Sequence, residues 1–382
     1  MIDSLLDDDF YKLSMGQLVF HKFFSTRVEY EFRCRNNIKW TKAHLGMINQ
    51  EIGKFVSLYF TEDEIEYLSK IEYFKKDYID FLKTYHPNIN NVHVDLLNDE
   101  LKLNIQGYWA NTIYWEVPLL AIISRANTIW SGNHTNSYGW FRSKFEDKLK
   151  YFNTHPFPLS DFGTRRRCNR DAQEYAISRL ADNPNFLGTS NVYLAKKYKV
   201  RPIGTQAHEL FMAAQATSKS LVNFQKDVLQ SWLDEYNGQL SIALTDTIGI
   251  DSFLKDFDLN FAQRYSGLRH DSGDPEVWAD KVLEHYKKLG IDAKTKTLVF
   301  SDGLNFEKAY SLYQKYKDVT NPIFGIGTYL TNDVPGLTPP NIVIKLVSCN
   351  NKPVAKISDS NGKCMCNDNV YVDNLKKVFN AK

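Results

Sequence analysis

Cysteine is scarce in this chain, and its spacing excludes the usual zinc modules. The 382 residues include five cysteines, and none of them forms a Cys-x-x-Cys pair. Cys364 and Cys366 stand close together, but no partner pair or nearby histidine completes a zinc site. Five scattered cysteines are typical of reduced thiols, and we expect a cytoplasmic protein.

Long apolar runs are also missing. The longest, Val117–Ile123, is far too short to span a bilayer. The first residues, Met1-Ile2-Asp3-Ser4-Leu5-Leu6-Asp7-Asp8-Asp9, are acidic, which fits neither a signal peptide nor a transit peptide. The sequence therefore predicts no membrane partner.

The chain lacks a charge excess of either sign. It has 47 basic and 45 acidic residues, a net charge of +2. Without a broad basic field we expect no nucleic-acid partner, and any anion binding should be local. The aromatic content of 14% is typical of a packed globular enzyme, and the length predicts two domains.

The first part of the chain has the pattern of an α+β domain. Alternating side chains over Thr26–Phe32 predict a half-buried strand, and Val92–Leu97 with Glu100–Gly107 predict an antiparallel pair. Helical patterns surround these strands. They cover residues 10–24, 43–59, 62–69 and 73–85.

From about Tyr114 the pattern changes to alternating strands and helices. Strands are predicted at Leu159–Gly163, Val200–Ile203, Ser241–Leu244, Gly267–His270, Thr297–Phe300 and Ile323–Gly325. Helices are predicted from the segment that begins at Trp115 through about Trp130, and at 140–152, 170–181, 192–198, 208–229, 250–257, 275–289 and 306–316. Repeated βα units imply parallel strands covered by helices, in a barrel or a doubly wound sheet.

We predict an α/β fold, an irregular βα barrel with an additional α+β domain. Residues 1–120 form the α+β domain and residues 121–340 form the barrel. The tail, about 341–382, offers strands at Asn341–Val347 and Pro353–Ile357. Because a closed barrel has no free edge, the tail is expected to join the N-terminal domain.

Polar and glycine-rich motifs follow the ends of most predicted strands, where the loops of a βα barrel build the active site. Gly204-Thr205 opens a long helix with Thr205 as its candidate N-cap, and His208 lies in the first turn. Two interpretations of His208 remain open. It packs or caps near the helix start, or it contacts phosphate or accepts a phosphoryl group.

Phe324-Gly325-Ile326-Gly327-Thr328 is either an ordinary glycine turn or a phosphate cradle of backbone N–H groups and a hydroxyl. It lacks the third glycine of the dinucleotide fingerprint. In Arg269-His270-Asp271-Ser272-Gly273-Asp274, helix capping by Ser272 or Asp274 explains part of the pattern. Alternatively, Arg269 could bind a carboxylate, and Asp271 and Asp274 could orient ribose hydroxyls or a magnesium ion. Asp302 either binds ribose hydroxyls or caps the next helix.

Asp161-Phe162-Gly163-Thr164-Arg165-Arg166-Arg167 places an aromatic ring next to three guanidinium groups. Such a segment suits a small aromatic substrate and phosphoryl groups, although a solvated basic turn is the alternative. Arg167 is expected at the surface. Tyr11 is interpreted from its pattern alone as a core aromatic.

Together with Asp9-Phe10-Tyr11-Lys12-Leu13, Gly188-Thr189-Ser190-Asn191 and Ser301-Asp302-Gly303-Leu304, these strings occur in an order that resembles the nicotinate phosphoribosyltransferase family, up to about Asp333. The resemblance implies a nicotinate site and a site for phosphoribosyl pyrophosphate (PRPP). The implied nicotinate residues are Tyr11, Phe162, Arg166, Thr205 and Arg269. The implied PRPP residues are Arg165, Ser190, Asp271, Ser272, Gly273, Asp302, Gly303, Gly325, Gly327 and Thr328.

The resemblance further implies that ATP phosphorylates His208 and that hydrolysis of this phosphohistidine drives nucleotide synthesis for NAD. No Walker loop is present, so ATP must bind by other means. We expect Mg²⁺ as a cofactor, with ligands left unassigned, and a homodimer in which Tyr11 crosses the interface. Nicotinamide phosphoribosyltransferase and, more remotely, a phosphate-binding βα-barrel lyase are the alternatives.

Overall fold

The computed structural model describes residues 1–130, 137–360 and 364–381. The sequence predicts a polar loop over Ser131–Tyr138, of which residues 131–136 lie outside this range. The chain divides into two compact units. Unit 1 comprises Met1–Ser25, Tyr30–Gly204 and Ile326–Ile344, and unit 2 comprises Thr26–Glu29, Thr205–Gly325 and Lys345–Lys382. No helix within the described range is long and apolar enough to cross a membrane.

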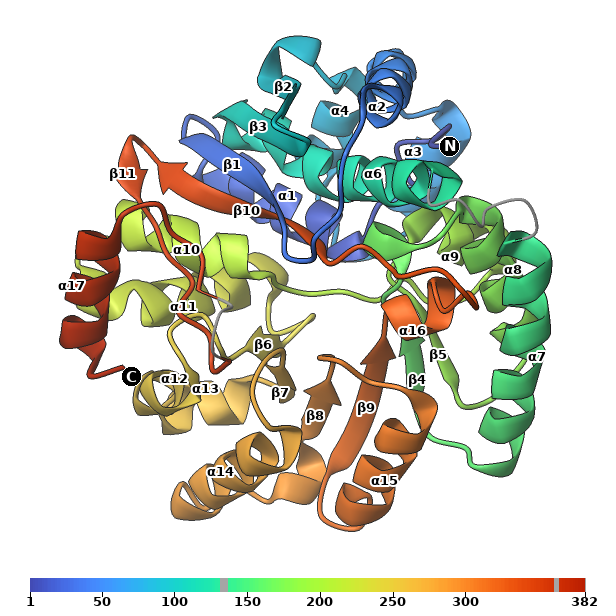
Figure 1. Ribbon diagram of the computed structural model, residues 1–382. Coiled ribbons are helices and arrows are strands. Elements are labelled where there is room, and N and C mark those ends of the chain that lie inside the picture. The colour runs from blue at the N-terminus through green and yellow to red at the C-terminus, as the bar shows by residue number, and fades with distance from the viewer. Residues whose placement is uncertain (131–136, 361–363, 382) are drawn as a thin grey trace. The chain divides into compact units, whose positions relative to one another are not determined.

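Unit 1 contains the helices from α1 to α9, helix α16 and two pairs of strands (Figure 1). Its helices are α1 (Phe10–Lys22), α2 (Lys42–Phe55), α3 (Glu62–Ser69), α4 (Lys76–Thr84), α5 (Trp109–Thr112), α6 (Glu116–Trp130), α7 (Ser137–Thr154), α8 (Arg170–Leu180), α9 (Val192–Tyr198) and α16 (Thr328–Thr331). In Figure 1, α7 and α8 lie side by side, and the rings of Phe145 and Tyr175 meet edge to face between them.

Strands β2 (Val92–Leu97) and β3 (Glu100–Tyr108) of unit 1 form the predicted antiparallel hairpin. The two turn residues, Asn98 and Asp99, have φ angles of 52° and 63°, as a tight two-residue hairpin requires. Strands β4 (Leu159–Asp161) and β5 (Phe186–Thr189) pair in parallel. The antiparallel hairpin of β2 and β3, among the helices of the first part of the chain, confirms the α+β character expected there.

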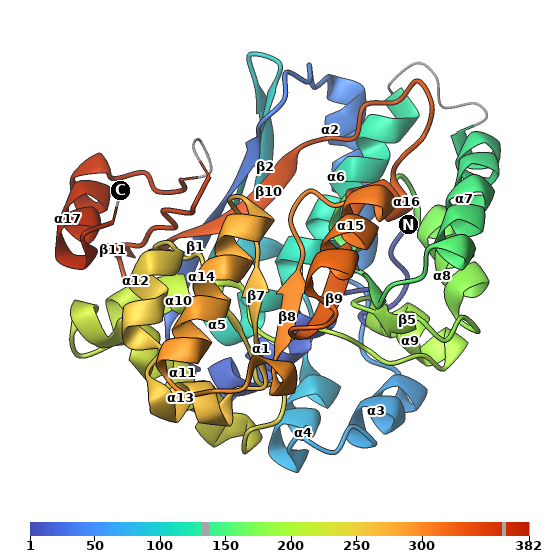
Figure 2. The ribbon, with the colours of Figure 1, turned by 90° about the horizontal axis from the view of Figure 1, so that it is seen from below.

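Unit 2 contains a parallel sheet in the order β6 (Ile242–Leu244), β7 (Gly267–His270), β8 (Thr297–Phe300) and β9 (Asn321–Ile326). The described helices of unit 2 are α10 (His208–Thr217), α11 (Phe224–Tyr236), α12 (Ile250–Asp256), α13 (Leu259–Arg264), α14 (Pro275–Lys288), α15 (Phe306–Tyr316) and α17 (Asn369–Phe379). Figure 2 shows α14 and α15 against one face of β7 and β8, and the Phe300 ring contacts Trp278 and Tyr316 there.

Three strands extend across the division of the chain. They are β1 (Arg27–Cys34), β9 and β10 (Ile342–Cys349). The short strand β11 (Lys352–Pro353) pairs antiparallel with β10 through Ser348 and Cys349. The parallel sheet with covering helices confirms an α/β fold, while closure into a barrel and the limits of the two domains stay predictions.

Several predicted elements need correction. Val200–Ile203 is not a strand, because Pro202 has no N–H to donate and forms a single bridge with Thr189. The strand in this region is β5, which ends in Gly188-Thr189. Gly188 has a φ of 136°, and a Cβ there would collide with the Arg201 carbonyl oxygen. No strand was predicted at Phe186–Thr189, because glycine is rare within strands.

The prediction of one helix over residues 208–229 is also wrong, because two helices, α10 and α11, lie in this region. Helix α10 ends at Thr217, and Ser218 is extended with a ψ of 149°. Two serines in Ser218-Lys219-Ser220 favour a break, since serine competes with the helical backbone for hydrogen bonds. Helices α5, α13, α16 and α17 were not predicted at all.

Candidate active site

His208 lies in unit 2 as the first residue of α10. The N-cap is Ala207 and not Thr205, whose hydroxyl instead donates to the Ile242 carbonyl at 3.0 Å. The His208 ring is buried, with Nε2 2.7 Å from Asp246 Oδ1 and 3.7 Å from Asp271 Oδ2. The first turn of the helix therefore presents an imidazole to two carboxylates.

Burial lowers the pKa of His208 to about 4, and the Lys356 ammonium acts in the same direction, against Asp246 and Asp271. Burial alone would raise the pKa of Asp246, but Lys356 and His208 outweigh it and hold that pKa well below its ordinary value. At neutral pH the ring is therefore neutral and the carboxylate is charged.

This charge state fixes the tautomer of His208. A charged Asp246 accepts hydrogen bonds only, so Nε2 must carry the ring proton and donate it. Nδ1 is then the unprotonated nitrogen, and none of the described residues forms a hydrogen bond with it. An imidazole in this state is a nucleophile at Nδ1.

The Asp246 carboxylate is held from three sides. Its Oδ1 contacts His208, while Oδ2 accepts the Ser272 hydroxyl at 2.5 Å and lies 2.9 Å from Lys356 Nζ. Neither Asp246 nor Lys356 was predicted from the sequence as a site residue. Asp246 stands just after β6, so the rule that polar residues follow strand ends could have found it. No motif marks Lys356.

His208, Asp246 and Asp271 offer three ligand atoms within 4.8 Å of one another. Lys356 Nζ is 2.9 Å from Asp246 and 4.0 Å from Asp271, so an ammonium group already neutralises this pair of carboxylates. The donor set therefore does not suit Mg²⁺, which needs several oxygen ligands without a competing cation.

Other predicted residues of unit 2 lie at the ends of β7, β8 and β9. Arg269 is in β7, and its Nε is buried without a hydrogen-bond partner among the described residues. Asp271 follows β7 and accepts the Ser301 hydroxyl at 3.0 Å. Asp274 is the N-cap of α14, as predicted. Asp302 and Gly303 follow β8, and Gly325 is in β9.

Unit 1 brings Tyr11 and Arg165 together. The Arg165 guanidinium carbon is 6.0 Å from the centre of the Tyr11 ring, and Tyr11 is 9% exposed. Ser190 donates its hydroxyl to Asp9 at 2.6 Å, and Asp9 lies 3.9 Å from Arg165. This cation–aromatic pair forms within one chain.

The predicted aromatic loop and the predicted phosphate loop also pack together in unit 1. Phe162 N donates to the Ile326 carbonyl at 2.9 Å, and a Cβ on Gly327 would lie 2.9 Å from the Phe162 carbonyl oxygen. The Thr331 hydroxyl donates to the Gly163 carbonyl at 3.0 Å. Thr328 opens α16 in this loop.

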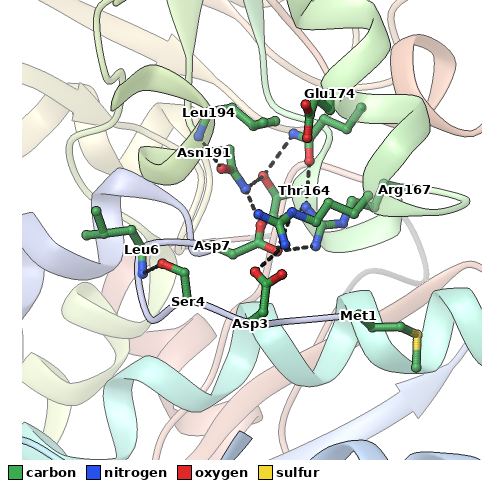
Figure 3. A network of polar contacts seen from close by, with 12 residues as sticks. Met1, Asp3, Ser4, Leu6, Asp7, Thr164, Arg167, Glu174, Asn191 and Leu194 are labelled. Carbon is green, nitrogen blue, oxygen red and sulfur yellow. Dashed lines mark hydrogen bonds and ion pairs between the residues drawn. The ribbon is translucent and has the colours of Figure 1, made fainter. Parts of the chain in front are cut away.

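Arg166 and Arg167 differ in their surroundings. Arg166 Nε donates to the Ile342 carbonyl at 3.0 Å, and its own carbonyl accepts from Asn332. Arg167 was predicted at the surface, but it is buried. It binds Asp7 through both terminal nitrogens at 2.7 and 2.6 Å (Figure 3). A run of arginines gives no sign of which one a buried carboxylate will pair with.

Comparisons with known proteins show the family of the chain. Family models match residues 6–124, as the nicotinate phosphoribosyltransferase N-terminal domain, and residues 157–382, as the nicotinate phosphoribosyltransferase family. A nicotinate phosphoribosyltransferase from Yersinia enterocolitica is 48% identical over 99% of this chain and 96% of its own length. One from Photorhabdus laumondii is 46% identical over 99% of this chain and 96% of its own length.

Solved structures agree. Nicotinate phosphoribosyltransferase from Vibrio cholerae matches with a TM-score of 0.94 and 36% identity, over 100% of this chain and 95% of that one. The enzyme from Porphyromonas gingivalis matches with a TM-score of 0.95 and 30% identity, over 100% of both chains. The chain belongs to the nicotinate phosphoribosyltransferase family.

Proposed function

We propose that the chain joins nicotinate to PRPP, forming nicotinate mononucleotide and pyrophosphate for NAD biosynthesis, and that it couples this step to ATP hydrolysis through a phosphohistidine at His208. The observation that carries the coupling is the neutral His208 ring, whose Nε2–H is held by Asp246 while Nδ1 keeps its lone pair. Membership of the family supports the overall reaction.

The glycosyl step needs positioning and charge stabilisation more than acid–base chemistry. As the bond from ribose C1 to pyrophosphate breaks, positive charge develops on the sugar, and carboxylates near it lower the barrier. The pyridine nitrogen attacks C1 as a neutral nucleophile, so no strong base is required. Asp271 and Asp302, after neighbouring strands of unit 2, are the carboxylates that we assign to the ribose.

Recognition of nicotinate requires a cation for its carboxylate and an aromatic surface for its ring. The unpaired, buried Nε of Arg269 supports carboxylate binding, since a guanidinium binds a carboxylate with two parallel hydrogen bonds. Phe162 and Tyr11 are assigned to the ring, and Thr205 and Arg166 to the same substrate. The homodimer with Tyr11 crossing the interface remains a prediction. Within one chain, Tyr11 already lies beside Arg165.

The phosphoryl groups of PRPP are assigned to glycine-rich and polar residues. In unit 1 these are Arg165, Ser190, Gly327 and Thr328, and in unit 2 they are Ser272, Gly273, Gly303 and Gly325. Ser272 and Gly273 also form hydrogen bonds within the protein. The Ser272 hydroxyl donates to Asp246, and Gly273 N donates to the Ser360 hydroxyl. Mg²⁺ would be held chiefly by the phosphates of its substrates and would neutralise charge on the leaving group.

In the coupling step, His208 Nδ1 attacks the γ-phosphorus of ATP, the bond to the β-phosphate oxygen breaks, and ADP leaves. Nε2 keeps its proton and its hydrogen bond to Asp246, so the positive charge on the phosphorylated ring faces a carboxylate. Water then attacks the phosphorus, the P–N bond breaks, and phosphate is released with the neutral ring restored.

The test is to mix the protein with PRPP and nicotinate, with and without ATP, and to measure pyrophosphate release. We expect release with nicotinate, stimulated by ATP. Release with nicotinamide and not nicotinate would favour the amide-using relative instead. A lack of release with either pyridine would contradict a phosphoribosyltransferase and would leave the remote alternative, a barrel lyase.

A further inference from the structure

Lys356 lies in the C-terminal segment of unit 2, far along the chain from the strand-end motifs. Its side chain is buried, and Nζ lies 2.9 Å from Asp246 Oδ2 and 4.0 Å from Asp271 Oδ2. These are the two carboxylates that face His208 Nε2, at 2.7 and 3.7 Å. The ammonium group therefore acts on His208 through both of its acidic neighbours.

The backbone around Lys356 is fixed on both sides. Lys356 exchanges two hydrogen bonds with Met365, at 3.1 and 2.9 Å. Ala355 N donates to the Gln215 side chain at 2.8 Å, and Ile357 N donates to the Thr247 carbonyl at 2.8 Å. Gln215 belongs to α10, the helix that begins with His208, so the segment is attached to the same helix as the imidazole.

Two more contacts attach the residues that follow. Asp359 N donates to the Ser272 hydroxyl at 3.1 Å, and that hydroxyl donates to Asp246 Oδ2 at 2.5 Å. The Asp359 carboxylate accepts from Ile250 N, at the start of α12, with both oxygens at 3.1 Å. The tail and the Asp246 carboxylate therefore belong to one hydrogen-bond network.

An imidazole beside two carboxylates would ordinarily become a cation, because each negative charge favours the protonated ring. A protonated ring has hydrogens on both nitrogens and cannot attack phosphorus. The charged groups that face the ring are Asp246, Asp271 and Lys356. Of the neighbouring groups, His270 interacts with both carboxylates, Asp359 with Asp246, and Arg269 with Asp271. Among the groups that face the ring, Lys356 supplies the positive charge that offsets the two negative ones.

We propose that Lys356 is a positioning residue for phosphoryl transfer: its ammonium group, placed by the C-terminal segment between Asp246 and Asp271, keeps the His208 ring neutral and fixes Asp246 as the acceptor of Nε2–H. This inference deepens the proposed function, since it concerns the step at His208. Lys356 contacts no reacting atom itself.

Replacement of the charge should change the pH dependence of His208 phosphorylation. In Lys356→Met, no ammonium group offsets the negative charge of the two carboxylates, so the pKa of His208 should rise. In the pH profile of phosphate incorporation from γ-labelled ATP, the acid limb should therefore move up by about one to two pH units. Incorporation should fall most at pH 6 and least at pH 8. Lys356→Arg, which keeps the charge, should keep the acid limb within about half a pH unit of the wild type.

Lys296→Met is the matched control, because Lys296 is also a buried lysine of unit 2 but donates only to the carbonyls of Tyr265 and Gln263. It should leave the acid limb unmoved. A uniform fall in Lys356→Met at every pH, with the limb in place, would mean that Lys356 is only structural and would overturn the proposal.

A second measurement separates this proposal from the phosphohistidine itself. The His208 imidazole is titrated by NMR in the full-length protein, with His208→Asn to assign its signal. In the wild type we expect a midpoint well below that of an ordinary histidine, and a higher midpoint in Lys356→Met or, if that variant does not fold, Lys356→Gln. An ordinary midpoint in the wild type, or equal midpoints in wild type and variant, would overturn the proposal even if labelling occurs. Shifted midpoints without labelling would show that Lys356 keeps the His208 ring neutral, but would reject the phosphohistidine and with it the role of Lys356 in phosphoryl transfer.

Discussion

Asp7 in unit 1 and Asp246 in unit 2 are both buried, each with several hydrogen bonds, and the two aspartates have different partners. In unit 1, Asp7 accepts two hydrogen bonds from Arg167 and one from Asn191, all at 2.6 to 2.7 Å. In unit 2, Asp246 accepts from His208, Ser272 and Lys356. Burial opposes ionisation of both, and in both the cations outweigh it and lower the pKa.

The difference lies in what the partner can do. A guanidinium stays protonated at any pH a protein experiences, so the pair of Asp7 and Arg167 is a permanent structural link. An imidazole can gain a proton, lose one or form a bond to phosphorus, so Asp246 orients a reactive group. A buried, paired carboxylate alone does not indicate a reactive site.

The largest expected effect comes from breaking the structural pair. Arg167→Met should lower the free energy of unfolding by about 3–5 kcal/mol, because it leaves Asp7 charged and buried without its main partner. Denaturant titration measures this. Adding Asp7→Asn should recover part of the loss.

The control for this variant is Arg179→Met, which removes an exposed arginine that pairs with Glu146. It should leave the stability nearly unchanged, because exposed pairs are screened by water. If Arg167→Met were as stable as Arg179→Met, the buried pair would not be the anchor of unit 1.

Breaking the reactive pair should reduce activity. Asp246→Asn should lower phosphate incorporation at His208 by about 10²-fold or more, because the amide no longer fixes the proton on Nε2. Labelling rates with γ-labelled ATP measure the effect. Asp256→Asn is the control, since Asp256 accepts from Gln225 elsewhere in unit 2. Wild-type labelling in Asp246→Asn would remove Asp246 from the mechanism.

Arg269 is a second arginine to compare with Arg167. Its Nε is buried without a carboxylate partner among the described residues. If nicotinate supplies that partner, Arg269→Ala should raise the KM for nicotinate about 10- to 100-fold. The KM for PRPP should change much less. Steady-state kinetics with each substrate varied measures both, and an unchanged KM for nicotinate would reject the assignment.

The smallest expected effect is a pH dependence. Burial lowers the pKa of His208 to about 4, so the neutral ring predominates above that value and is lost as the pH falls through it. Phosphate incorporation in the wild type should therefore change little from pH 8 to about pH 5, whereas an ordinary histidine would lose half its neutral form near pH 6.5. Short labelling pulses after a pH jump, with circular dichroism as a check of folding, test this. A half-maximum near pH 6.5 would contradict the burial of a neutral ring.

The sequence predicted those elements whose ends carry strong local signals. The strands β7 and β8 and the helices α3, α9 and α15 have the predicted limits, since each combines an apolar pattern with clear caps or turns. The hairpin of β2 and β3 was equally clear from Asn98-Asp99. Strand β5 was not predicted, because it contains Gly188. A strand was wrongly predicted at Val200–Ile203, where Pro202 forms only a single bridge.

Parts of the candidate site depend on contacts between residues distant in sequence. The position of His208 at a helix start was predictable from Gly204-Thr205, although the cap was not. Lys356 lies 148 positions after His208 and reaches Asp246 only because the tail hydrogen-bonds to α10 and to Thr247. Arg167 pairs with Asp7 across 160 positions, and no local pattern distinguishes it from Arg165.

The most direct test of the account is to compare the wild type with His208→Asn after incubation with γ-labelled ATP, followed by isolation of the protein. The account predicts acid-labile, base-stable label on the wild type and none on His208→Asn, with ATP hydrolysis lost in parallel. Label that persists on His208→Asn, or ATP hydrolysis that continues at the wild-type rate, would contradict it.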